Sequence, residues 1–133
     1  GPDSMALLHM MTRACPAMPI VALTFDHGLR KGSAAEARRV GDWIADWPNV
    51  THHILDWSGK KPDTAVMETA RNARYDHLSR WCKKNDVHHL WVAHHADDQA
   101  ETFFFRLAKG SGLDGLGGMV ADTPFEDTGV HLI

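Results

Sequence analysis

Short apolar runs rich in β-prone residues alternate along this chain with longer segments whose apolar residues recur at helical spacing. The expected strands are residues 19–25, 50–57, 88–94 and 130–133. The expected helices are residues 4–13, 33–47, 64–84 and 98–109. Strands that alternate with helices of this length form crossover units, whose strands are parallel. The expected fold class is therefore α/β: a Rossmann-like parallel sheet with helices on both faces, incomplete at both ends.

Two of the helical segments carry signals for how they begin and which side they bury. Ser33 with Glu36 three residues later is the pattern of a capping box. The apolar side chains at helix spacing, expected to face the sheet, are Val40, Trp43, Ile44 and Trp47 in one helix and Met67, Ala70, Leu78 and Trp81 in the other. Several remaining polar pairs are interpreted as packing or solvated residues: His52-His53, His88-His89, Arg38-Arg39 and Lys60-Lys61.

Composition excludes several classes of protein. The chain has 133 residues, 44% hydrophobic and 23% charged, which suits one globular domain. It has no apolar run long enough to span a membrane and no signal-peptide pattern at its start, so no membrane association is expected. Its two cysteines, Cys15 and Cys82, form no metal or disulfide pattern, and a reducing cytoplasm fits. The formal net charge of −3 gives no overall basic field for nucleic acid, so any RNA contact must be local.

The first four residues have the pattern of a phosphate-binding loop that opens into a helix. Gly1 lets the backbone approach an anion closely, and the first amides of the helix that follows point at it. Asp3 would hold a metal ion that bridges the phosphates, and Ser4 would donate its hydroxyl to them. The competing interpretation is that Gly1 and Pro2 remain from cloning and that Asp3 or Ser4 caps the helix.

Three further segments are candidates for a site, and the first two follow expected strand ends, where ligands gather in parallel sheets. The first, residues 26–30, is also explained by a plain turn at Gly28. The second, residues 94–102, offers two histidines and three carboxylates, which is more than its alternative role as a capping box of Asp98 and Glu101 requires. The third, residues 109–119, holds five of the eleven glycines, which suits a lid over a ligand or a surface loop.

Taken in order, these motifs resemble those of a known family. Gly1 to Met5 is similar to the end of the Ser-Gly-Gly-x-Asp-Ser loop of the ATP-pyrophosphatase, or PP-loop, superfamily. The other matching segments are residues 26–30, Ala70-Arg71 with Ala73-Arg74-Tyr75, residues 95–102, and Arg106 with residues 110–116. Together they resemble the tRNA(Ile)-lysidine synthetase family, from Gly1 to about Val120.

The resemblance implies an ATP-dependent ligase that acts on the wobble cytidine of the tRNA(Ile) bearing a CAU anticodon. ATP adenylates the C2 oxygen of the cytidine, and free L-lysine then attacks C2 and expels AMP, which gives lysidine. The partners implied are this tRNA and L-lysine, the cofactors are ATP and Mg²⁺, and assembly as a homodimer is left open.

The resemblance also assigns roles to residues of this chain. The residues implied for ATP binding are Gly1, Asp3, Ser4, Phe25 and His27, with Asp3 as the metal ligand. His95, Asp98 and Glu101 would be catalytic and serve the lysine and the activated base. Arg106, Gly110, Ser111 and Gly112 would form a lysine-binding or lid loop.

The chain departs from the family pattern at both ends. The strand before the phosphate loop and the tRNA-binding domains after the sheet are missing, so residues 1–133 are expected to be a partial PP-loop catalytic domain that is inactive alone. Two alternatives stay open. One is a tRNA-thiolating PP-loop enzyme, although such enzymes commonly use a cysteine pair. The other is a metal-dependent phosphoesterase built on Asp26, His27, His94, His95, Asp97 and Asp98.

Overall fold

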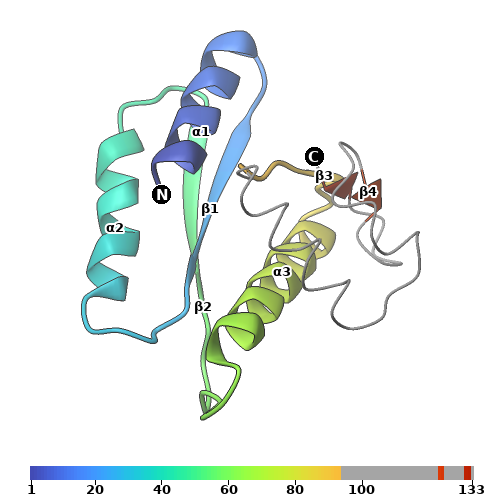
Figure 1. The fold of residues 1–133 in the computed structure, drawn as a ribbon. Coiled ribbons are helices and arrows are strands. Elements are labelled where there is room, and N and C mark those ends of the chain that lie inside the picture. The colour runs from blue at the N-terminus through green and yellow to red at the C-terminus, as the bar shows by residue number, and fades with distance from the viewer. Residues whose placement is uncertain (94–122, 125–130, 133) are drawn as a thin grey trace.

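The computed structural model describes residues 1–93, 123–124 and 131–132 (Figure 1). The expected alternation of strands and helices is confirmed in this part of the chain. The elements in order are α1 (Pro2–Ala14), β1 (Ile20–Asp26), α2 (Ser33–Ile44), β2 (Val50–Asp56), α3 (Val66–Lys84), β3 (His89–Leu90), β4 (Thr123–Pro124) and β5 (His131–Leu132). The expected helix over residues 98–109 and the glycine-rich loop lie outside the described residues.

The strands pair mainly in parallel, as expected. β1 pairs with β2 in parallel along its whole length, from Ile20 beside Val50 to Asp26 beside Asp56. The short strands form a second sheet in the order β3-β5-β4, in which β3 is parallel and β4 antiparallel to β5. The closing strand was therefore expected correctly, whereas the antiparallel partner β4 was not.

Helices cover both faces of the β1-β2 pair, as neighbouring residues of β2 demonstrate (Figure 1). The His52 ring lies against Gly41 of α2, and the His53 ring lies 5.3 Å from the Trp81 ring of α3. Successive side chains of a strand point to opposite faces, so α2 and α3 must lie on opposite sides of the sheet. The expected arrangement of helices on both faces is thus confirmed for these two helices.

The main buried cluster lies between α3 and the strands. It consists of Tyr75, Leu78, Cys82 and Leu90, with Leu23 and Leu55 packed against it. Met67, expected to belong to the apolar stripe of α3, is 80% exposed, because burial is confined to the later turns of the helix. Trp43 of α2 is 59% exposed as well, since the buried residues of that helix, Ala37 and Ile44, define a neighbouring face. Both expectations were wrong.

Within the described part of the chain, none of the helices combines the length and the apolar character needed to cross a membrane.

Close contact between α2 and β2 depends on a glycine. A Cβ atom added to Gly41 would lie 2.9 Å from Nδ1 of His52. The other ring nitrogen of His52 shares a 2.8 Å hydrogen bond with the Thr24 hydroxyl on β1. The imidazole is therefore held from two sides and has little room to move away from α2.

We expect Gly41→Ala to destabilise the fold by about 1 kcal/mol, because overpacking costs about 1–3 kcal/mol and exceeds the gain of about 1 kcal/mol in helix propensity. Urea unfolding measures the change. The matched control is the same substitution in a His52→Ala background, where the clash is gone and Gly41→Ala should stabilise. Destabilisation of equal size in both backgrounds would contradict the contact.

Stability should also fall on acidification through His52. Burial lowers the pKa of this imidazole, and the neighbouring His53 lowers it further. The unfolded chain then takes up this proton at a higher pH than the folded chain does, so the stability contributed by neutral His52 is present above about pH 6.5 and is lost as the pH falls towards the folded-state pKa. Urea midpoints at pH 7.5 and 5.5 should differ less in His52→Gln than in the unsubstituted protein. An unchanged difference would exclude His52 as the source.

Candidate active site at the carboxyl ends of β1 and β2

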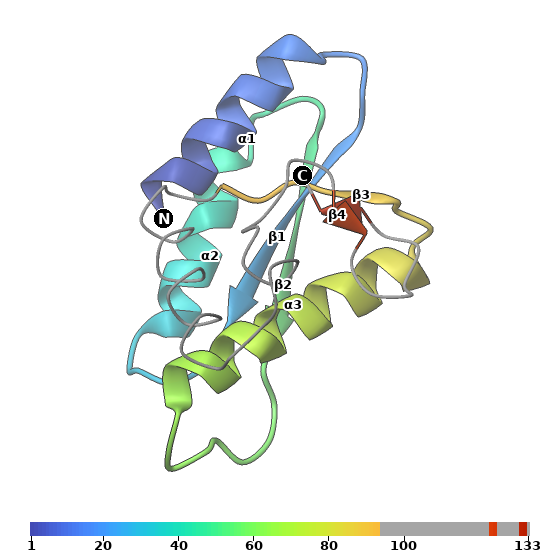
Figure 2. The ribbon, with the colours of Figure 1, turned by 45° about the vertical axis from the view of Figure 1, so that its right-hand side comes forward.

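The helices α1, α2 and α3 run opposite in direction to the strands β1 and β2 (Figure 2). In Figure 2, α1, α2 and α3 each begin towards the end of the molecule at which β1 and β2 finish. The amides of a helix N-terminus attract anions, and parallel sheets bind ligands at the carboxyl ends of their strands. This end of the molecule is therefore the candidate site.

A tight turn closes β1. The Gly28 amide donates a 2.9 Å hydrogen bond to the Asp26 carboxylate, and the Leu29 amide donates a 3.0 Å hydrogen bond to Nδ1 of His27. Gly28 adopts a φ of 60°, a conformation that favours glycine. Because Nδ1 of His27 accepts a hydrogen bond, the proton of the neutral ring lies on Nε2, which is left as a donor.

Asp26 is a buried carboxylate held by its surroundings in the charged form. Only 9% of the residue is exposed. A hydrogen bond from the Ser33 hydroxyl lowers the pKa of Asp26, and the Gly28 amide, His27 and Lys61 lower it further against the opposing effect of burial. The group is thus a fixed negative charge that organises the turn and the start of α2.

The expected capping box at the start of α2 was wrong. The N-cap is Gly32, with a φ of 96°, and no side chain among the described residues caps this helix. Ser33 bonds to Asp26 instead, and Glu36 forms a 2.6 Å ion pair with Arg30. Asp26 lies at the end of β1 and Arg30 lies in the turn that follows, so both partners precede the helix in the sequence. A capping pattern, which considers only residues at the start of the helix, does not include them.

The loop after β2 closes over this turn. The Trp57 amide donates a 2.9 Å hydrogen bond to the Asp26 carbonyl, so the loop begins beside the end of β1. The Lys61 ammonium donates a hydrogen bond to the Trp57 carbonyl and lies 4.4 Å from the centroid of the Trp57 ring. The Phe25 ring has two aromatic neighbours: its centroid lies 6.3 Å from that of the Trp57 ring and 5.3 Å from that of the His77 ring.

Sequence reasoning missed the contribution of this loop. Lys61 was interpreted as a solvated residue, whereas it is half-buried beside Asp26 and Trp57. The available signal was its position in the loop that follows an expected strand, as residues 26–30 also follow one. His77 had no signal in its own segment, because its contact with Phe25 depends on how α3 packs on the sheet.

The start of α1 shows no capping by any described side chain. The N-cap is Gly1, Pro2 follows at the start of the helix, and none of the described side chains makes a capping hydrogen bond there. The interpretation of Asp3 or Ser4 as an N-cap was therefore wrong. Asp3 and Ser4 lie in the first helical turn, where geometry leaves backbone amides without an intrahelical acceptor.

The expected site residues that the structure describes fall into two groups. Gly1, Asp3 and Ser4 lie at the start of α1, and Phe25 and His27 lie at the end of β1. The remaining expected site residues lie outside the described part: His95, Asp98, Glu101, Arg106, Gly110, Ser111 and Gly112.

Among the residues that the structure describes, no group of three or more His, Cys, Asp or Glu side chains could hold a metal ion. Asp26 and His27 therefore do not assemble a metal site with other described residues, and the other members of the phosphoesterase set, His94, His95, Asp97 and Asp98, lie outside them. The Asp26 carboxylate is also occupied by Ser33 and Gly28.

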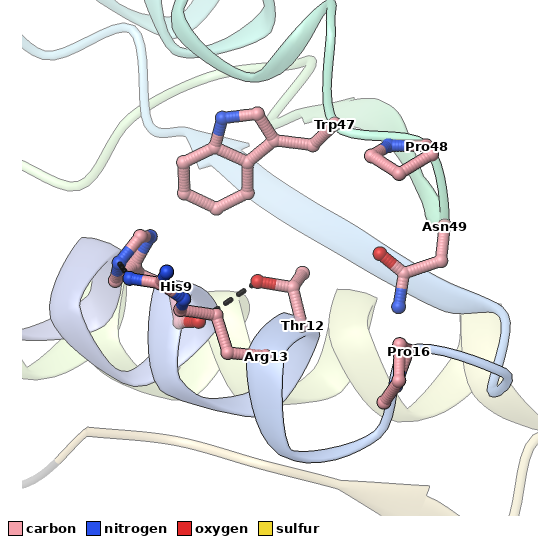
Figure 3. Close-up of a pocket in the computed structure, with 7 residues that line it drawn as sticks. All are labelled: His9, Thr12, Arg13, Pro16, Trp47, Pro48 and Asn49. Atoms are coloured by element: carbon pink, nitrogen blue, oxygen red, sulfur yellow. Dashed lines mark hydrogen bonds between the residues drawn. The ribbon is translucent and has the colours of Figure 1, made fainter.

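A hollow of about 280 Å³ lies away from this site, between the end of α1 and the turn before β2 (Figure 3). The His9 and Trp47 rings meet edge to face there, with their centroids 5.4 Å apart. The Asn49 amide holds the carbonyl oxygens of Cys15 and Met18 at 3.1 and 3.2 Å. These contacts attach α1 to the rest of the fold at the amino ends of the strands.

A family model defines the class of protein to which this fold belongs. The chain belongs to the PP-loop domain family, whose model matches residues 1–132, and membership of this family implies the use of ATP.

Curated relatives of the chain within this family include several enzymes named tRNA(Ile)-lysidine synthase. The chain is 47% identical over 124 residues to a tRNA(Ile)-lysidine synthase of Wolbachia sp. subsp. Brugia malayi, which covers 90% of the chain and 28% of that relative. It is 45% identical over 119 residues to the tRNA(Ile)-lysidine synthase of Methylobacterium nodulans, covering 90% of the chain and 35% of the relative. It is 41% identical over 132 residues to that of Zymomonas mobilis, covering 99% and 39%. The chain thus spans well under half the length of these relatives.

We expect Ser33→Ala to raise the pKa of Asp26, because the hydroxyl is the largest of the influences that lower it. The carboxylate loses a donor, so stability at pH 7 should fall by about 1 kcal/mol. The loss should shrink as the pH falls through the Asp26 pKa, since the protonated group no longer needs this donor. Carbon-13 NMR titration of the Asp26 carboxyl carbon measures the pKa, and urea unfolding measures the stability.

Ser58→Ala is the matched control, because Ser58 is exposed in the loop after β2. It should leave the titration of Asp26 unchanged. If Ser33→Ala also leaves that titration unchanged, the hydrogen bond from Ser33 does not hold the carboxylate.

Proposed function

We propose that this chain, residues 1–133, is part of the PP-loop catalytic domain of a longer tRNA(Ile)-lysidine synthetase. The observation that carries the proposal is identity of 40–47% to enzymes of that name over at least 90% of the chain. The parts of the relatives beyond this match leave room for the domains that would bind tRNA. The proposed setting is the cytoplasm.

The proposed reaction has two steps at the wobble cytidine of tRNA(Ile) with a CAU anticodon. The cytidine C2 oxygen attacks the α-phosphate of ATP, and the bond to pyrophosphate breaks. The neutral side-chain amine of L-lysine then attacks C2, a carbon–nitrogen bond forms, and AMP leaves with the oxygen. The protein must hold the triphosphate, orient two substrates and receive the proton that the amine loses.

The start of α1 would hold the phosphates. Gly1 permits close approach, and Ser4 offers its hydroxyl and amide within the first turn. The finding that Gly1, and neither Asp3 nor Ser4, is the N-cap supports this role, because neither side chain is used for capping.

The end of β1 would hold the adenosine part of ATP. Phe25 contributes an apolar ring, and His27 keeps Nε2–H as a donor because its Nδ1 accepts the Leu29 amide. The turn is fixed by Asp26, so these groups are positioned before the ligand arrives. Such preorganisation reduces the entropy that binding would cost.

Mg²⁺ is proposed as the cofactor, with Asp3 as its ligand. The donor set fits, because Mg²⁺ in phosphate sites commonly takes one or two carboxylates and completes its coordination with phosphate oxygens and water. When bound, the ion would neutralise charge on the leaving pyrophosphate. One carboxylate at the phosphate end is sufficient for that purpose, and a larger cluster is not required.

The lysine side of the site is proposed from residues beyond the described part. Carboxylates of Asp98 and Glu101 would receive the lysine, His95 would serve the activated base, and Arg106 with residues 110–112 would close the loop over the substrates. A homodimer remains compatible with this assignment.

The alternative of a thiolating enzyme is not favoured. Cys82 is 1% exposed within the core, and burial raises the pKa of its thiol. Cys15 follows the last residue of α1, at the opposite end of the fold from the candidate site. Reactive thiolates need a lowered pKa and access, so these two cysteines do not supply a thiolation pair.

Incorporation of radiolabelled lysine into a tRNA(Ile) transcript with a CAU anticodon tests the proposal, using the complete enzyme, ATP and Mg²⁺. We expect incorporation in the unsubstituted enzyme and at least a tenfold loss in Asp98→Asn and in Glu101→Gln, equivalent to about 1.4 kcal/mol of transition-state stabilisation. Melting temperatures should hardly change, because Asn and Gln serve as well in a helix cap.

Two outcomes would count against the proposal in different ways. An inactive unsubstituted enzyme that nevertheless binds ATP would exclude lysidine formation. Full activity in both variants would leave the reaction standing and show that Asp98 and Glu101 only begin a helix.

A further inference from the structure

One cation at the strand ends is held by contacts that the proposed mechanism does not use. Lys61 lies in the loop after β2, half-buried, and its ammonium bonds to the carbonyl oxygen of Trp57. The same ammonium lies 4.4 Å from the centroid of the Trp57 ring. The neighbouring Lys60 is exposed.

Lys61 also lies against the turn that closes β1. A Cβ atom added to Gly28 would come within 3.8 Å of Cε and 3.9 Å of Nζ of Lys61, so the side chain passes directly beside the glycine. Gly28 is the residue whose amide the Asp26 carboxylate holds at 2.9 Å. Two side chains therefore meet at Gly28: Asp26 from the end of β1 and Lys61 from the loop after β2.

The loop is tied to β1 by further contacts around Lys61. The Trp57 amide donates to the Asp26 carbonyl at 2.9 Å, and the Trp57 ring lies 6.3 Å from the Phe25 ring. A movement of Trp57 would therefore be transmitted both to Phe25 and to the backbone before His27. These are the two residues proposed to hold the adenosine part of ATP.

We propose that Lys61 is a positioning residue for ATP, which holds Trp57 and the turn of residues 26–29 in the arrangement that receives the nucleotide. It acts through Trp57 and Gly28 and does not itself touch the reacting atoms. Its ammonium lies between the turn after β1 and the loop after β2, which are separated in the sequence by α2 and β2. The hydrogen bond to the Trp57 carbonyl and the cation–π contact with the Trp57 ring together give the ammonium one defined position. This inference rests on the proposed ATP site at the end of β1.

Lys61→Met tests the role, since methionine keeps much of the apolar stem and removes the charge. In the complete enzyme we expect the Kd for ATP, measured by calorimetry, and the KM for ATP in the lysine-incorporation assay each to rise about tenfold. The KM values for lysine and tRNA and the kcat at saturating ATP should stay within about twofold, because the reacting groups are untouched. Lys61→Arg should restore most of the affinity, as guanidinium also binds a carbonyl and an aromatic face.

Lys60→Met is the matched control, with the same chemistry one residue earlier in the same loop, and should leave the Kd and KM for ATP unchanged. The inference is wrong if Lys61→Met binds ATP normally, if kcat falls while KM for ATP is unchanged, or if Lys60→Met has an equal effect. The calorimetric arm measures ATP binding without lysidine formation, so absence of lysidine in the unsubstituted enzyme would overturn the proposed reaction while this inference is still tested.

Discussion

The parallel pairing of β1 with β2 determines where the described part of the site can form. The register runs from Ile20 beside Val50 to Asp26 beside Asp56, so both strands end at the same level. The chain must then return along a helix after each strand, which places the starts of α2 and α3 at that same end. The turn after β1 and the loop after β2 become neighbours as a consequence, and their contacts build the site.

A buried negative charge then makes this junction specific. Asp26 is 9% exposed, and a carboxylate in that position is tolerated only with donors around it. Its donors come from the Gly28 amide and the Ser33 hydroxyl, and Lys61 adds a favourable charge from the loop after β2. The turn, the start of α2 and the loop after β2 are therefore linked through one side chain. The proposed nucleotide would therefore meet a surface that is already organised.

The two ends of the fold have different tasks. At the amino ends of the strands, Asn49 and Trp47 attach α1 through contacts with backbone carbonyls and the His9 ring. At the carboxyl ends, the polar groups surround a turn and the helix starts. The PP-loop family model matches residues 1–132 and so covers both ends. The hollow near Trp47 lies at the amino ends of the strands, where it separates α1 from the turn before β2, and it is therefore distinct from the candidate site.

The sequence alone determined the order and type of most of the described elements, although not the short strand β4. Alternating apolar runs and helical patterns predicted β1, β2 and all three described helices, because side-chain period is a local property of the chain. Gly28, in the segment after an expected strand, predicted the turn that closes β1 because glycine favours such a backbone conformation. The tertiary structure decided the partners. Ser33 bonds to Asp26 and not to its own helix, Lys61 leaves solvent to lie on Trp57, and His52 fits against Gly41. The contacts of Ser33 with Asp26 and of His52 with Gly41 each join two different secondary elements, whereas the contact of Lys61 with Trp57 lies within one loop. Polar groups select their hydrogen-bond partners only when burial makes an unpaired group costly. Local patterns cannot encode that choice, since it depends on the distance between segments after the chain has folded.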